Sequence, residues 1–207
     1  MKRLRHLLTA TLGALVLAGC QAANPYYDGS KPHRRPGGFQ NTHLDFQPKG
    51  LIELLRWRWD ALRQGLPPPP ARPTPTVAAD LAFITANAKA GAAMEPAVTW
   101  IGHATVLAQL SGLNVLTDPV FSQRASPVQF FGPQRAQAPG VALEQLPHID
   151  IVLVSHNHYD HLDEASVRAL NAQAGGPPLF VVPLGMKPWL AGVGITNAVE
   201  LDWWQSH

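Results

Sequence analysis

The stretch "SHNHYDHLD" contains four side chains able to bind metal ions among six consecutive residues. They are His156, His158, Asp160 and His161. Imidazole nitrogens and carboxylate oxygens are common zinc ligands. Four such groups beside a buried strand would also be costly to desolvate without a cation. The cluster therefore predicts a metal site, and the alternative is a solvated histidine loop that binds no metal.

The spacing within the cluster favours two ions over one. Residues at i and i+2 of an extended segment point to the same side, so His156 and His158 can share one ion. Asp160 and His161 follow at a turn, where a second ion nearby is the simpler solution. Two zinc ions would lower the pKa of a water between them and generate hydroxide near neutral pH. Asp160 is then also the candidate catalytic residue, because it could orient that hydroxide.

The elements expected around the cluster are a strand before it and a helix after it. Val152, Leu153 and Val154 form an apolar run typical of a buried strand. Asp163 and Glu164 are typical of a helix start, with Asp163 as the predicted cap. Further upstream, "AVTWIGHATVLAQL" and "LNVLTDPVF" flank "SG", which predicts a β-hairpin of two long strands.

The motif "SHNHYDHLD" resembles the H-x-H-x-D-H signature of the metallo-β-lactamase fold. The phrases "TWIGHATVL", "LTDPVFSQRASP", "FFGP" and "ELDWW" are similar to the N-acylphosphatidylethanolamine-hydrolysing phospholipase D branch and its bacterial lipoprotein relatives. The resemblance implies an α/β fold, a four-layer αββα sandwich, with two zinc ions. The first two histidines would bind one zinc, and the aspartate and last histidine the other. It also implies a phosphodiesterase acting on phospholipid-like substrates. The alternatives are another hydrolase of this scaffold, such as a sugar-phosphate lactonase, and an inactive metal-binding lipoprotein.

Two more residues fall at predicted strand positions that this family brings close to its metals. Asp118 is interpreted either as an acceptor that fixes a ligand imidazole or as an Asx-turn residue before Pro119. His103 either orients the substrate or the attacking water, or is a hydrogen-bonded core histidine. The core histidine is the favoured interpretation.

The family places its remaining metal ligands after the "ELDWW" segment, where only Gln205, Ser206 and His207 follow here. The resemblance therefore implies that residues 76–207 hold only the N-terminal half of the domain. Such a half domain, with two candidate ligands per ion, is expected to bind zinc poorly and to be inactive. The alternative is a shorter natural variant with a rearranged site.

Residues 1–19 have the layout of a signal peptide, with a basic start and an apolar run of about 13 residues, too short to span a bilayer. "LAGC" resembles a bacterial lipobox and ends at Cys20, the sole cysteine. The resemblance implies acylation of Cys20 and a lipid-anchored protein of the bacterial envelope, facing the periplasm and expected at the outer membrane. The alternative is a buried or free cysteine.

Residues 20–75 form a basic extension between the leader and the domain. The pattern over 51–66 predicts an amphipathic helix, which packs on its own domain in the favoured interpretation or lies among lipid headgroups in the other. Residues 67–75, "PPPPARPTP", predict a stiff spacer. Without residues 1–19 the chain has 13 basic against 14 acidic residues, so a nucleic-acid partner is not expected.

Overall fold

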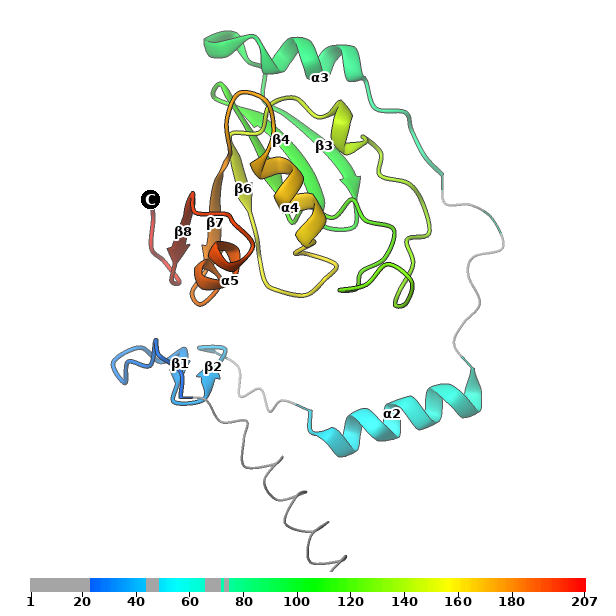
Figure 1. The fold of residues 1–207 in the computed structure, drawn as a ribbon, viewed down its shortest axis with the longest axis vertical. Helices are drawn as coiled ribbons and strands as arrows, with labels where there is room; N and C mark the ends of the chain where they lie inside the picture. Colours follow the sequence, from blue (N-terminus) through cyan, green and yellow to red (C-terminus); the bar gives the residue numbers. More distant parts are fainter. Residues whose placement is uncertain (1–22, 44–48, 66–71, 73–74) are drawn as a thin grey trace, which may run out of the picture. The chain divides into compact units, whose positions relative to one another are not determined.

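The computed structural model describes residues 23–43, 49–65, 72 and 75–207 (Figure 1). The chain divides into two compact units, residues 1–73 and 74–207. The predicted signal peptide and Cys20 lie outside the described residues, and so does the predicted spacer apart from Arg72 and Pro75. Within the described ranges, no helix is long and apolar enough to cross a bilayer.

The first unit contains a small antiparallel pair and one long helix. The pair is β1 (Arg34–Arg35) with β2 (Gly38–Phe39), and the helix is α2 (Leu51–Gln64). The predicted amphipathic helix is therefore confirmed. It ends before Gly65, which has a φ of 75°, a conformation that glycine adopts without a Cβ clash. No residue of α2 is buried, so the packing predicted for its apolar stripe stays a prediction.

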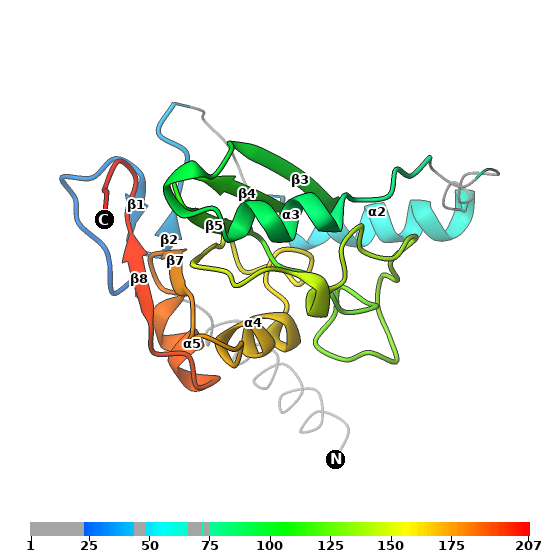
Figure 2. The same ribbon diagram turned by 90° about the horizontal axis from the view of Figure 1, so that it is seen from above.

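The second unit is built on a mixed β-sheet whose strands follow one another in chain order (Figure 2). The strands are β3 (Ala97–Gly102), β4 (Thr105–Leu110), β5 (Leu113–Thr117), β6 (Ile151–Leu153), β7 (Leu179–Pro183) and β8 (Ala198–Leu201). From β3 to β5 the pairs are antiparallel, and from β5 to β8 they are parallel. The connection from β6 to β7 runs through α4 (Glu164–Asn171) and the one from β7 to β8 through α5 (Lys187–Gly192), whereas residues 118–150 join β5 to β6 without an α-helix. The predicted α/β fold class is therefore confirmed.

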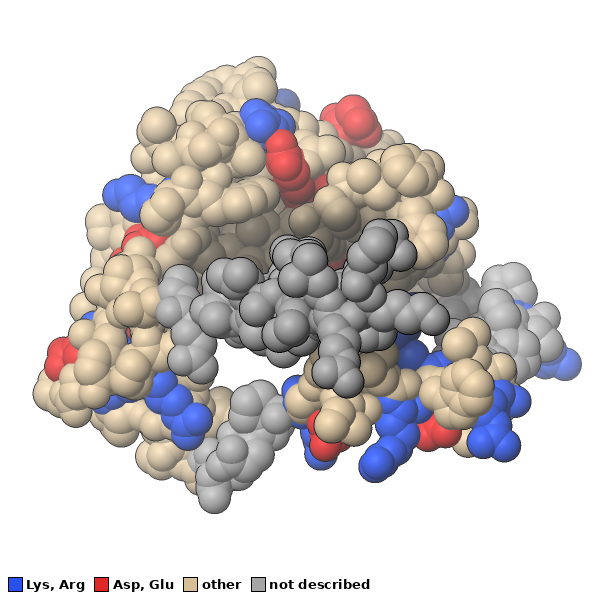
Figure 3. Space-filling model, turned by 60° about the horizontal axis from the view of Figure 1, so that its bottom comes forward, with Lys and Arg blue, Asp and Glu red and all other residues tan. Residues whose placement is uncertain are grey.

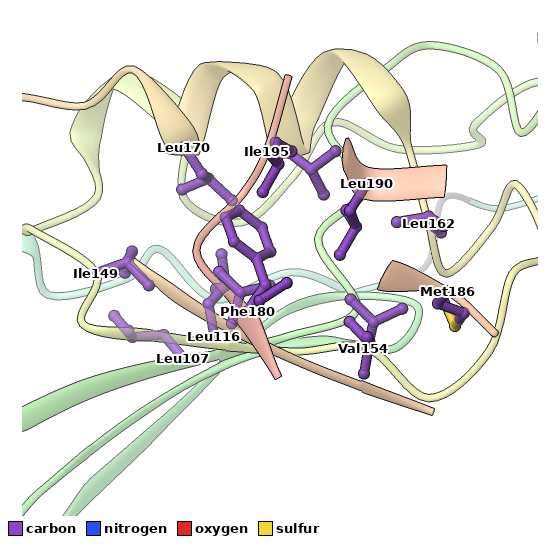
Figure 4. Packing of buried hydrophobic residues seen from close by; sticks show 14 of the residues in the cluster. Leu107, Leu116, Ile149, Val154, Leu162, Leu170, Phe180, Met186, Leu190 and Ile195 are labelled. Carbon is purple, nitrogen blue, oxygen red and sulfur yellow. The ribbon is translucent and has the colours of Figure 1, made fainter. Parts of the chain in front are cut away.

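One face of this sheet is covered by helices. The strands contribute Leu107, Leu116, Val152 and Phe180 to a single hydrophobic core, and α4 contributes Val167 and Leu170 (Figure 4). Leu190 of α5 and Ile84 of α3 (Leu81–Ala88) belong to the same core. Each fully buried side chain of this size contributes about 1.5–3 kcal/mol to folding. The opposite face includes exposed apolar side chains, namely Val98, Trp100, Leu110, Leu113 and Leu153.

The first long strand of the predicted hairpin is two strands in the structure. Residues 97–110 form β3 and β4, which reverse direction at Gly102 and His103. Both residues have positive φ angles, 149° and 50°. Apolar residues stand on both sides of this turn, so the sequence pattern indicated one strand. The second turn is confirmed: β4 and β5 are antiparallel, and Ser111 and Gly112 have φ angles of 53° and 80°, as two-residue hairpin turns favour.

Candidate metal centre

The four clustered residues lie on a loop between β6 and α4, as predicted. The loop leaves the sheet after Val154, whose N–H still donates to the carbonyl of Val181 at 3.0 Å. It then turns sharply, because the N–H groups of His161 and Leu162 both donate to the carbonyl of His158, at 2.9 and 2.7 Å. This turn brings residues from both ends of the motif to one side of the loop.

His156 and His158 form a close pair of candidate metal ligands. Their nearest nitrogens, Nε2 of His156 and Nδ1 of His158, are 3.1 Å apart. Two ligands of one tetrahedral zinc, each about 2.0–2.1 Å from the ion, are separated by roughly 3.3 Å. Partial burial lowers the pKa of His156, and the neighbouring His161 and His158 lower it further. A lowered pKa favours the neutral imidazole that metal binding needs.

His103, Asp160 and His161 form a second group, in which one ligand atom of each lies within 4.8 Å of the others. Oδ2 of Asp160 is 3.0 Å from Nε2 of His103 and 3.6 Å from Nε2 of His161. Burial alone would raise the pKa of Asp160, but a backbone hydrogen bond and the contact with His103 hold it below its ordinary value. The donors of both groups, imidazole nitrogen and ionised carboxylate oxygen, fit zinc and similar ions.

The sequence suggested strand positions for His103 and Asp118. In the structure neither residue occupies the predicted strand position. His103 lies in the β3–β4 turn with 56% of its side chain exposed, so the favoured core-histidine interpretation is wrong. Asp118 follows the last residue of β5 and has a φ of 37°. A non-glycine residue in this region costs of order 1–3 kcal/mol, and such residues concentrate at functional sites.

Asp118 directly contacts the loop between β6 and α4, residues 154–163, which we call the metal-binding loop. Its Oδ2 is 2.9 Å from Nδ1 of His161, and its Oδ1 accepts from the N–H of Ser155 at 2.7 Å. The first contact is the one needed to orient a ligand imidazole, and it leaves Nε2 of His161 on the side of Asp160. Ser155 was not among the predicted site residues. Its Oγ is 2.8 Å from Oδ2 of Asp118 and 2.9 Å from Nδ1 of His156, so it connects the two donor groups.

Asp163 occupies the predicted cap position of α4, but its side chain makes no capping bond to the helix backbone. The carboxylate accepts instead from the N–H and Oγ of Ser122, at 3.1 and 2.9 Å, and from Oγ of Ser166. Only 7% of Asp163 is exposed. The predicted bond to the helix backbone is therefore wrong: the carboxylate binds the segment after β5 and a serine side chain of α4.

A cavity of about 1460 Å³ opens beside the loop. His103, His158 and Asp160 lie in its wall, and much of the remaining wall is apolar, including Trp100, Val120, Leu162, Met186 and Trp189. The described residues that line the cavity include one basic side chain, Arg135. Candidate metal ligands thus face a space large enough for a ligand with a long apolar part.

Residues 113–207 match the model of the beta-lactamase superfamily domain. This segment includes the H-x-H-x-D-H signature, whose candidate metal ligands lie close together in the structure. The chain contains a metallo-β-lactamase superfamily domain. N-acyl-phosphatidylethanolamine-hydrolyzing phospholipase D 1 of Caenorhabditis elegans is 47% identical over 116 residues, which are 52% of this chain and 32% of that protein. A UPF0173 metal-dependent hydrolase of Anaeromyxobacter is 38% identical over 96 residues, 46% of this chain and 30% of that protein.

Another relative, an uncharacterized protein of Mycobacterium tuberculosis, matches a longer part of this chain. It is 38% identical over 97% of this chain. The chain spans about half of that relative, 52% of its length. Among solved structures, isothiocyanate hydrolase from Delia radicum gut bacteria is 26% identical with a TM-score of 0.40, over 51% of this chain and 41% of that one.

Proposed function

We propose that the protein is a zinc-dependent hydrolase that cleaves a phosphodiester bond in phospholipid-like substrates. The observation that carries this proposal is the position of His103, His158 and Asp160 in the wall of a large, mostly apolar cavity. A phospholipid has a phosphodiester for the metal centre and long chains for apolar walls. The nematode relative, named as a phospholipase D that hydrolyses N-acyl-phosphatidylethanolamine, supports the same substrate class.

In this proposal His156 and His158 hold one zinc, and Asp160 and His161 hold the second with His103 beside them. When bound, the zinc pair polarises the phosphodiester and activates a water for attack. Asp118 keeps the His161 ring oriented through its contact with Nδ1 at 2.9 Å. Oδ2 of Asp160, 3.0 Å from Nε2 of His103, also orients the attacking water. The apolar walls bind the chains of the substrate and exclude bulk water.

The test is hydrolysis of N-acylphosphatidylethanolamine by the full-length protein, with both products measured by mass spectrometry. Chelation should abolish turnover, and added zinc should restore it. Asp160→Asn should lower the rate by about 10²–10⁴ while reducing the zinc content far less. Glu164→Gln is the matched control, because this carboxylate follows the loop but pairs with Arg168 at 2.8 Å. Protein that binds zinc yet cleaves no phosphodiester would refute the proposal, and cleavage of a sugar-phosphate lactone would identify the alternative.

We also infer that the protein is anchored to the bacterial envelope, facing the periplasm at the outer membrane, through an acylated Cys20. The support is the lipobox-like "LAGC" at the end of a short apolar run. A single acyl chain gives only marginal membrane binding, so stable anchoring needs a second chain or a basic patch. An anchor of this kind would keep the hydrolase close to phospholipid substrates.

A further inference from the structure

The cavity contains a fixed cation that the proposed hydrolysis does not use. Nε of Arg135 donates to the carbonyl of Ser122 at 3.2 Å, and Nη2 donates to the carbonyl of Val120 at 2.5 Å. Two carbonyls on one segment therefore hold the guanidinium in a single orientation. Burial lowers the pKa of Arg135 and the charge of Asp163 opposes this, but a guanidinium in a protein stays protonated.

The third nitrogen of Arg135 lies beside the β3–β4 turn that carries His103. Nη1 lies 3.8 Å from the position that a Cβ on Gly102 would occupy, and Gly102 directly precedes His103. Among the described residues, neither hydrogen bond of the Arg135 side chain uses Nη1. The nearby carboxylate of Asp163 accepts from Ser122 and Ser166 instead. The cation thus lies at the cavity wall with a donor available, and no carboxylate among the described residues is bonded to it.

We propose that Arg135 is the anion-binding residue of this cavity, and that it takes an amphiphile with a phosphate or carboxylate group next to an apolar chain. A guanidinium offers a planar fork that matches either anion. Trp100, Val120 and Trp189 line the same space and suit the chain. As a statement about the substrate this inference rests on the proposed function, but anion binding by Arg135 does not require hydrolysis.

One cation can decide which ligands bind where few other charges are present. Uncharged atoms predominate on the face shown in Figure 3, and only 14% of all residues are charged. In a wall made mostly of apolar groups, a charge-assisted hydrogen bond is stronger than the same bond in water. An anionic amphiphile should therefore bind more tightly than a neutral one with the same chain.

The test measures binding of n-octyl phosphate, n-octanoate and n-octanol to the full chain, with tryptophan fluorescence as the signal. The titrations are repeated after metals have been removed by chelation. n-Octyl phosphate should bind roughly 10- to 100-fold more tightly than n-octanol. Arg135→Gln should remove this preference and leave the affinity for n-octanol unchanged. The n-octanoate titration distinguishes a general anion site from a phosphate site. If n-octanoate binds like n-octanol, the site is one for phosphate.

Arg124→Gln is the matched control. Arg124 lies on the same segment, but it bonds the carbonyl of Gly132 and Oε1 of Gln134 and is not part of the cavity wall. This variant should keep the preference. If Arg135→Gln does not fold, Arg135→Lys serves instead, and it should weaken the preference at least threefold because lysine lacks the fork. Unchanged binding of n-octyl phosphate by the Arg135 variant, or no preference in the parent, would overturn the inference. Loss of hydrolysis with the preference intact would overturn the proposed function alone.

Discussion

Replacing Asp163 with alanine should destabilise the second unit far more than the loss of a helix cap. A lost cap typically costs about 1 kcal/mol. Asp163 is only 7% exposed, however, and its carboxylate accepts from the N–H of Ser122 and from two serine hydroxyls. The substitution removes the acceptor of all three bonds at once.

The expected loss follows from what each donor can do afterwards. A hydrogen bond to a charged group contributes about 1.5–3 kcal/mol. The hydroxyls of Ser122 and Ser166 can rotate toward other acceptors and recover part of this. The backbone N–H of Ser122 cannot rotate, and an unsatisfied donor of this kind costs about 1–3 kcal/mol. Neighbouring effects are not additive, so we expect the free energy of unfolding to fall by about 3 kcal/mol, with the N–H of Ser122 as the largest single contribution.

The measurement is urea unfolding of the full chain, comparing midpoints at equal m values. Glu164→Gln is the control, because Glu164 and Arg168 each have a half-exposed side chain (50%) and form an i,i+4 pair. Such a pair contributes at most about 0.5 kcal/mol. If Asp163→Ala lost less than about 1 kcal/mol at an unchanged m value, the buried contacts would contribute no more than a cap, and our reasoning would be wrong.

Asp118→Asn removes the charge 2.9 Å from Nδ1 of His161 and should lower metal affinity about 10- to 100-fold in a zinc titration; unchanged affinity in folded protein would contradict the orienting role. Cys20→Ser, expressed in a Gram-negative host, should release the protein from the membrane fraction or leave the leader uncleaved, and a variant that fractionates and migrates like the parent would rule out acylation. Leu55→Glu on α2, where Leu55 is 56% exposed, should lower the unfolding midpoint and leave sedimentation with anionic vesicles unchanged if α2 packs on its own domain, the favoured interpretation. Weakened sedimentation with an unchanged midpoint would support the position among lipid headgroups instead.

The metal-binding loop could be predicted because its signals are local. The apolar run of β6, the i, i+2 spacing of His156 and His158, and the helix start at Glu164 are adjacent in the sequence. Each reports the structure of its own few residues, so together they located the loop and its donors. The fold class needed more, and it came from resemblance to a family rather than from periodicity.

The rest of the site depends on contacts between distant segments. His103 and Asp160 are 57 positions apart, and Asp118 and His161 are 43 apart. Asp118 reaches the loop because β5 and β6 are parallel with Thr117 opposite Leu153, which places Asp118 beside the start of the loop. Nothing in the apolar alternation of either strand sets this register. His103 required in addition a turn at Gly102 and His103, within a run of mostly apolar residues whose pattern predicts one strand.

One short segment after β5 holds both ends of the metal-binding loop. At its start, Asp118 bonds Ser155 and contacts His161. Four residues later, Ser122 bonds Asp163 at the point where the loop enters α4. The positive φ of Asp118 costs about 1–3 kcal/mol, and these bonds offset it because each charge-assisted bond contributes on a similar scale. Polar bonds to this segment, together with the burial of Val154 and Leu162 in the core, therefore fix the ends of a loop whose ligands must face a cavity and cannot be buried.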